Sequence, residues 1–294
     1  MDFPNDISNI GNYVFSGCSS LISVTMPSNI TSIGSGAFQE CSSITSLEIP
    51  ENVNHIGEYA FAQTSLTSIK IPSNITEIEK GVLQETNIAS IVIPEGVTKI
   101  GENAFLGCNN LTTISIPNSV KSIGQRAFFG SKLVSIIIPE GVTEINSETF
   151  ATCKNLTSII LPHSLLNIGN YAFYSSGISS ITIPAQVNSI GSYAFSDCYS
   201  LKLISSLNSN PPVIKENTFS SYDAVLELPI GSKDVYSSAD YWKLFTNIVE
   251  IENSGINKPQ IIKGKKMRLY DINGHQFSKP RKGLNIVDGK KVIY

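Results

Sequence analysis

The sequence predicts a repeat solenoid, a coil of about nine turns of 22–23 residues with a parallel β-sheet on its concave face. Three observations predict it: a regular proline spacing, a short apolar run before each proline, and columns of isoleucine and phenylalanine after it. Nine of the fourteen prolines recur at intervals of 22 or 23 residues: Pro4, Pro27, Pro50, Pro72, Pro94, Pro117, Pro139, Pro162 and Pro184. We expect the array to be capped at its C-terminal end and followed by a small β-rich module.

The apolar run of each turn has the alternation of a strand. In LTSIKIP, Ile69 and Ile71 are predicted to point inward, while Ser68 and Lys70 point outward. Pro72 lacks an N–H group and therefore ends the strand. The period and the L-x-x-I-x-I strand lie within the leucine-rich-repeat range, in which one turn buries its apolar edge only by stacking on its neighbours.

The second half of each turn carries an isoleucine, usually a glycine, and a phenylalanine four residues after the glycine position. We expect the glycines either to adopt a turn conformation with positive φ or to allow close approach of two turns. The phenylalanines should form a stacked column. The glycine column is Gly11, Gly34, Gly57, Gly101, Gly124, Gly169 and Gly191, interrupted by Glu79 and Asn146, and Leu83 takes the place of one phenylalanine.

The five cysteines each follow a phenylalanine by three residues, in turns whose bend is one residue longer: Cys18, Cys41, Cys108, Cys153 and Cys198. A small apolar thiol that fills the wider bend explains this placement. Only Cys18 and Cys41 lie on adjacent turns, so a disulfide is conceivable there alone, and we favour free thiols. No CxxC motif or Cys/His cluster suggests a metal or redox site.

The repeat array is predicted over residues 1–206 and a C-terminal cap over 207–252. In the cap, Val235, Ala239 and Trp242 stand at helical spacing, and we interpret Trp242 as a core residue over the last turn rather than a ligand platform. Residues 253–294 carry ten Lys/Arg against two Asp and predict a small basic module, with hairpin turns at Asn273-Gly274 and Asp288-Gly289. A solvated strand face explains this charge better than a nucleic-acid site, because no binding motif accompanies it.

Composition excludes several function classes. No apolar run is long enough for a transmembrane helix. The three histidines fall at unrelated places in their turns, and no carboxylate pair is brought together by the repeat. We therefore expect no enzyme, no catalytic residues, no metal site and no cofactor.

The pattern IPxxVxxIGxxAFxxCxxLxSIxIP resembles the bacterial leucine-rich repeats called BspA-like, or Treponema pallidum-type, over residues 1–206. The segments NPPVIKENTF and LPIGSKDVYSSADYWKLFTNIVEI resemble caps of such arrays in Bacteroides-type surface proteins, and the C-terminal segment resembles a short module of the same bacteria. The resemblance implies an exported or cell-surface, adhesin-like protein that binds a host matrix or cell-surface protein. No signal peptide precedes the array, so we expect the natural chain to begin earlier.

Outward strand positions form two columns that could hold a partner. The first is almost all serine, which suits a crowded sheet: Ser23, Ser46, Ser68, Ser90, Thr113, Ser135, Ser158 and Ser180. The second varies, as a binding surface would, and is the candidate partner-binding face: Glu48, Lys70, Val92, Ser115, Ile137, Ile160 and Thr182, with Thr25 before them. Aliphatic residues at these outward positions can mark a partner site, or they can simply be good strand formers.

We expect a protein-binding module, monomeric, without a nucleic-acid partner. Two alternatives stay open, a glycan-binding surface protein and a passive spacer. Aromatic residues on the outward strand columns would favour the glycan alternative, but those columns contain none. A separate tyrosine column, two residues before the phenylalanine, could pack against neighbouring loops or serve as contact anchors: Tyr13, Tyr59, Tyr171 and Tyr193.

Overall fold

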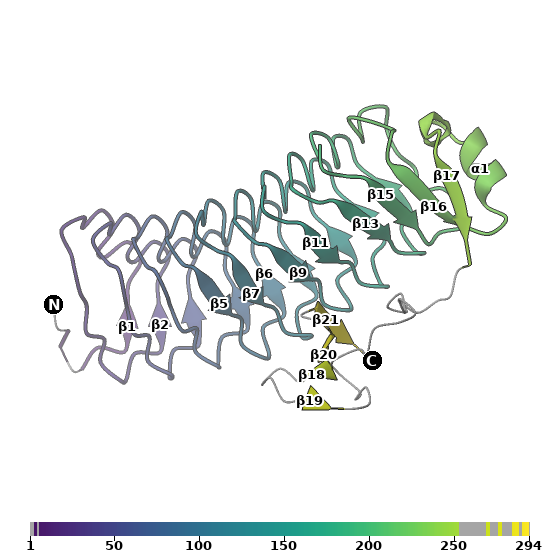
Figure 1. Ribbon diagram of the computed structural model, residues 1–294. Coiled ribbons are helices and arrows are strands. Elements are labelled where there is room, and N and C mark those ends of the chain that lie inside the picture. The colour runs from purple at the N-terminus through teal and green to yellow at the C-terminus, as the bar shows by residue number, and fades with distance from the viewer. Residues whose placement is uncertain are drawn as a thin grey trace. The chain divides into compact units, whose positions relative to one another are not determined.

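The computed structural model describes residues 3–4 and 6–252, together with four strands of the C-terminal segment. Residues Met1–Ile251 and Glu252–Tyr294 form two compact units. The first is a parallel β-solenoid of about eleven stacked turns, which confirms the predicted fold class. Nine turns were predicted, and the two further turns lie within residues 207–252. This segment therefore continues the coil and does not only cover its end (Figure 1).

The predicted strands form a ladder along one side of the coil. They are β5 (Ser90–Val92), β7 (Thr113–Ser115), β9 (Ser135–Ile137), β11 (Ser158–Ile160), β13 (Ser180–Ile183), β15 (Leu203–Ser206), β16 (Val225–Pro229) and β17 (Ile248–Ile251). Pairing is parallel and in register within three groups, β5-β7, β9-β11 and β13-β15-β16-β17, as in Ile136 opposite Ile159. The corresponding segments of the first turns, residues 46–48 and 68–70, run alongside without strand hydrogen bonding of this kind.

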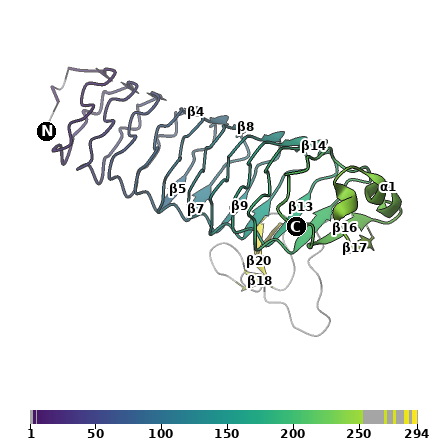
Figure 2. The same cartoon turned by 90° about the horizontal axis from the view of Figure 1, so that it is seen from above.

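A second set of parallel strands, not predicted from the sequence, follows the isoleucine column. Each has only two residues: β1 (Asn9–Ile10), β2 (Ser32–Ile33), β3 (His55–Ile56), β4 (Glu77–Ile78), β6 (Lys99–Ile100), β8 (Ser122–Ile123), β10 (Glu144–Ile145), β12 (Asn167–Ile168) and β14 (Ser189–Ile190). Seen from above, β4, β8 and β14 lie along the side opposite β5, β7, β9 and β13 (Figure 2). The isoleucine of each short strand is buried and faces the core between the two ladders.

The glycine after each short strand serves close approach, and the alternative of a positive φ was wrong. A Cβ on Gly101 would lie 2.7 Å from the backbone nitrogen of Lys80, in the preceding turn. Most positive-φ positions lie elsewhere, two residues before and two residues after each phenylalanine position, and the majority of these are not glycine. Tyr13, Tyr59, Tyr171 and Tyr193 all occupy the first of these two columns.

The short strands form three separate sheets, β1-β2-β3, β4-β6-β8 and β10-β12-β14. The breaks coincide with the two turns in which the glycine is replaced. Elsewhere the glycine N–H donates to an isoleucine carbonyl of the preceding turn, as Gly101 does to Ile78 at 2.7 Å. At Asn146 the side-chain amide nitrogen instead donates to the Ile123 carbonyl at 2.6 Å. A Cβ at this position therefore separates neighbouring turns enough to interrupt the ladder.

The phenylalanines form the predicted stack, here called the phenylalanine stack. Successive rings from Phe15 to Phe61 and from Phe105 to Phe219 are nearly parallel, with centroids 5.2–5.9 Å apart. Leu83 interrupts it. Phe219 then meets Trp242 and Phe245 edge-on, at 5.9 and 5.4 Å. The stack is thus closed at the C-terminal end by rings turned across it.

The cap contains helix α1 (Lys233–Ser238) and a 3₁₀ turn, η1 (Trp242–Leu244). Trp242 is 1% exposed, and its indole N–H donates to the Pro212 carbonyl at 2.7 Å, so its interpretation as a core residue is confirmed. The predicted helical face was wrong in part, because Val235 points to solvent and Tyr236 is the buried residue of α1. The Tyr236 hydroxyl bonds to Ser206 at 2.7 Å and to the Asn208 carbonyl at 2.9 Å.

The second unit contains β18 (Leu269–Tyr270), β19 (Gln276–Phe277), β20 (Leu284–Val287) and β21 (Lys290–Ile293), in the order β19-β18-β20-β21. All pairings are antiparallel. The strands on either side of both predicted turns therefore pair as hairpins do. The turn dipeptides Asn273-Gly274 and Asp288-Gly289 themselves, and most of the basic side chains, lie outside the described residues.

Candidate functional site

The outward side chains of the long strands form a continuous surface, which we call the strand face. Every member of the predicted second column is exposed except Thr182, which is half-buried. The register brings neighbours side by side: Val92 lies opposite Ser115, and Ile137 lies opposite Ile160. The structure extends the column through Ser205 and Glu227 to Val249, which the sequence missed because the proline spacing ends before them.

The centre of the strand face is apolar. Val92 is 70% exposed, and Ile137 and Ile160 are 38% and 43% exposed. Val134, just before β9, is also exposed but belongs to neither outward column. Ile137 and Ile160 lie on the adjacent strands β9 and β11 and form a short apolar ridge, the kind of surface that partners cover, whereas Ser115 stands between Val92 and this ridge.

The margin of this apolar ridge is charged. Next to the ends of β9 and β11, the His163 ring nitrogen and the Glu140 carboxylate lie 2.9 Å apart. Partial burial alone would raise the pKa of Glu140, but hydrogen bonds from the His163 ring and backbone N–H hold the pKa below its usual value. The carboxylate therefore stays ionised beside the ridge at neutral pH.

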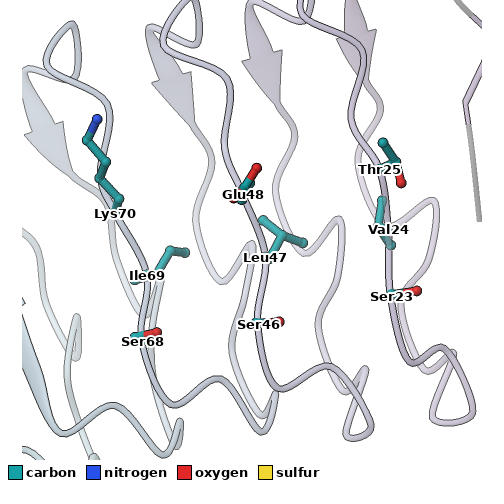
Figure 3. A pocket seen from close by; sticks show the side chains of 9 residues that line it. All are labelled: Ser23, Val24, Thr25, Ser46, Leu47, Glu48, Ser68, Ile69 and Lys70. Carbon is teal, nitrogen blue, oxygen red and sulfur yellow. The ribbon is translucent and has the colours of Figure 1, made fainter.

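The N-terminal end of the strand face is a polar hollow (Figure 3). Ser23, Ser46 and Ser68 lie in one row along it, and Thr25, Glu48 and Lys70 lie in a second. Between the two rows, Val24, Leu47 and Ile69 form the floor. The hollow forms where the segments carry no strand ladder, so aliphatic atoms that are covered elsewhere are partly reachable here.

Lys70 is the cation of the hollow, and it pairs with Glu51 from the preceding turn. The Lys70 ammonium, as a hydrogen-bond donor, holds the pKa of the Glu51 carboxyl below its usual value. Glu48 and Lys70, two predicted site residues, thus lie in the same hollow, whereas Ile137 and Ile160 lie three and four turns beyond Lys70. The structure brings the predicted residues onto one face but not into one compact pocket.

Other chemistry is sparse in the part of the chain that the structure describes. Among these residues, no group of three or more His, Cys, Asp or Glu side chains could hold a metal ion, and no helix is long and apolar enough to cross a membrane. All five cysteines are free thiols, and Cys18 alone of them is exposed.

Comparison with known proteins settles the family. The sequence profile of the BspA type leucine rich repeat region matches six copies over residues 1–112 and 76–202. The chain belongs to the BspA-type leucine-rich repeat family. Solenoids of the leucine-rich-repeat kind are generally non-enzymatic binding scaffolds, and their partners are generally proteins. No curated protein shows a significant sequence match to this chain.

Solved structures resemble the BspA-type array over much of its length. A leucine-rich cell surface protein of Faecalibacterium prausnitzii is 26% identical, with 87% of this chain and 88% of that chain covered and a TM-score of 0.54. The Treponema pallidum leucine-rich repeat protein is 26% identical, with 68% and 77% covered and a TM-score of 0.42. The pneumococcal vaccine antigen PcpA is 20% identical, with 85% and 78% covered and a TM-score of 0.49.

Proposed function

We propose that this BspA-type protein is a surface-exposed, adhesin-like module that binds a host matrix or cell-surface protein through the strand face. The observation that carries the proposal is the pair Ile137 and Ile160, two exposed isoleucines directly opposite each other on adjacent strands. Val92 is a further exposed aliphatic residue of the same column, two strands before Ile137.

The cellular setting is part of the same proposal. The similar protein of Faecalibacterium prausnitzii is described as a cell surface protein. An exported protein of a Bacteroides-type bacterium also accords with the cap and C-terminal segments of the sequence. We take the array over residues 1–206 as the binding part, residues 207–252 as its cap, and residues 253–294 as a separate basic module. A monomer suffices, because the whole strand face belongs to one chain.

The test replaces the central isoleucine pair by an oppositely charged pair, Ile137→Lys with Ile160→Glu. Opposite charges directly across two strands are compatible with the ladder, so the fold should persist, as circular dichroism can verify. Binding of the full chain is measured on a panel of purified extracellular-matrix proteins by surface plasmon resonance. For any matrix protein that the unmodified chain binds, we expect the double variant to bind at least tenfold more weakly.

The matched control is Val235→Lys, because Val235 is 44% exposed, as Ile160 is 43% exposed, but lies on α1 outside the strand face. This variant should bind as the unmodified chain does. Equal affinity of the double variant and the unmodified chain would place the contact outside the apolar ridge and refute the proposal.

A further inference from the structure

Four tyrosines gather around one carboxylate near the C-terminal end of the array, outside the strand face. We call Tyr171, Tyr174, Tyr193 and Tyr199, with Asp197, the tyrosine cluster. They lie in the bends that follow β12 and β14 and precede β13 and β15. Tyr171 and Tyr193 belong to the tyrosine column predicted from the sequence. Tyr174 and Tyr199 lie outside that column and follow them in the same two bends.

Three rings of the cluster contact one another, and Tyr199 is linked to them through Asp197. Tyr171 and Tyr193 stack with centroids 4.8 Å apart, and Tyr174 meets Tyr171 edge-on at 5.7 Å. Tyr171 and Tyr193 are 38% and 37% exposed, whereas Tyr199 is 79% exposed. Tyr199 therefore presents most of its ring to solvent, next to rings that are held in place by their neighbours.

Hydroxyl groups surround the Asp197 carboxylate. The Tyr199 hydroxyl donates to Asp197 Oδ1 at 2.9 Å, and Ser220 Oγ lies 3.5 Å from the same atom. The pKa values of Tyr174 and Tyr199 are raised because both hydroxyls hydrogen-bond to Asp197. Ser220 also accepts the Asp197 backbone N–H at 2.7 Å and bonds to Ser196 at 2.8 Å. The carboxylate is thus fixed in a group of hydroxyls that can each donate and accept.

We propose that the tyrosine cluster is a binding site for a neutral saccharide. A sugar ring has an apolar C–H face, which packs on an open aromatic ring, and an edge of hydroxyls that exchange hydrogen bonds with a carboxylate and with other hydroxyls. Tyr199 supplies the open ring, and Asp197 with Ser220 supplies the polar edge.

The experiment uses the full chain and affinity gel electrophoresis in gels that contain soluble starch, barley β-glucan or yeast α-mannan. We expect at least one of these polysaccharides to retard the unmodified protein, with retardation that persists in 0.5 M sodium chloride. Tyr199→Ala should raise the dissociation constant at least tenfold. Asp197→Asn should raise it severalfold, and asparagine tolerates the positive φ of 58° at this position.

The control is Tyr13→Ala, because Tyr13 belongs to the same column as Tyr171 and Tyr193 and is 58% exposed at the other end of the array. It should leave retardation unchanged. Three results would overturn the proposal: no retardation by any of the three polysaccharides, retardation that Tyr199→Ala leaves unaltered, or salt-sensitive binding of polylysine in place of polysaccharide. None of these results bears on the strand face, so the two proposals fail or stand separately.

Discussion

The Cys153 thiol donates a hydrogen bond to the backbone carbonyl of Phe128, which lies 3.1 Å away and 25 residues earlier. Cys41, Cys108 and Cys198 make the same bond to the preceding turn, at 3.0–3.1 Å. In two of the four shorter bends a threonine bonds within its own turn, as Thr86 does to the Leu83 carbonyl at 2.9 Å. The cysteines therefore do more than fill the wider bend, because each buried thiol adds a hydrogen bond between turns to a carbonyl that also accepts one within its own turn.

Cys153→Ala should lower the free energy of unfolding by about 1–3 kcal/mol, because the buried site loses both the packing of the sulfur and its hydrogen bond to the Phe128 carbonyl, which retains only the Ser131 N–H as a donor. Urea unfolding of the variant and the unmodified protein measures the difference. Cys18→Ala is the control and should change stability by less than about 0.5 kcal/mol, since Cys18 is exposed. A stability equal to that of the unmodified protein would show that neither the packing nor the hydrogen bond of the thiol stabilises the array.

Alkaline pH should destabilise the array through the same thiols. Burial raises the pKa values of Cys41, Cys108 and Cys153 from 9.0 to about 11. Between these values the unfolded chain releases protons that the native state retains, so the free energy of unfolding falls as pH rises from 9 to 11. Guanidinium midpoints measured at pH 8, 9, 10 and 11 test this. The fall should be shallower in Cys153→Ala, and an identical pH dependence in that variant would contradict the assignment.

Gly101→Ala should destabilise the array by about 1–3 kcal/mol, because its Cβ would press on the backbone of the preceding turn. Glu79→Ala is a matched control in the same column of the adjacent turn, where the structure already accommodates a Cβ, and should have an effect below about 0.5 kcal/mol. Thermal unfolding followed by circular dichroism compares the two. Equal losses for both variants would show that the glycine column reflects something other than close approach.

Val82 and Leu83 should compensate each other. Most other turns pair alanine with phenylalanine at these positions, and both Val82 and Leu83 are buried. Leu83→Phe alone should overpack the core by about 1–3 kcal/mol, and Val82→Ala alone should leave a cavity. Combined, they restore the alanine–phenylalanine pair and continue the phenylalanine stack. The double variant should therefore be at least about 1 kcal/mol more stable than the sum of the single effects predicts, and strict additivity in urea unfolding would refute the compensation.

Tyr236→Phe should lower the free energy of unfolding by about 1–3 kcal/mol, because the Tyr236 hydroxyl hydrogen-bonds both to the Ser206 hydroxyl and to the Asn208 carbonyl. Trp242 is the chain's single tryptophan and contacts Tyr236 edge-on at 5.2 Å, so its fluorescence reports on this region directly. Fluorescence-detected urea unfolding of the variant should show a lower midpoint. Tyr199→Phe, at an exposed ring, serves as the control and should leave that midpoint in place.

Much of the array could be predicted from the sequence because its contacts repeat. Once Ile69 and Ile71 are assigned inward, the equivalent residues of every other turn are predicted to point inward too, because the turns stack in register. The phenylalanine column could be predicted by the same argument. The two-residue strands could not be predicted, because a segment as short as Lys99–Ile100 has no alternation to recognise. The role of the glycines could not be decided either, because close approach depends on a backbone 22 residues away.

The candidate sites were predictable to different degrees. The outward columns followed from strand alternation, and the structure exposes Ile137 and Ile160 as expected. The extension to Val249 lies beyond the last regular proline, so no spacing pointed to it. Val235 was assigned to the wrong side because α1 is only six residues long, too short for its spacing to define a face. The tyrosine cluster needed the three-dimensional neighbourhood, since Tyr174 and Asp197 come from different turns.

The two breaks in the short-strand ladder divide the array into blocks of three turns, with boundaries at Glu79 and Asn146. These boundary residues are exactly three repeats apart in sequence, so excising residues 79–145 would join Ile78 directly to Asn146 with every column still aligned. On either side of the new junction, the residues would come from turns that already lack the column glycine. The array is thereby divided into interchangeable segments, and its reach can be shortened or lengthened by whole blocks while the ends that finish it stay the same.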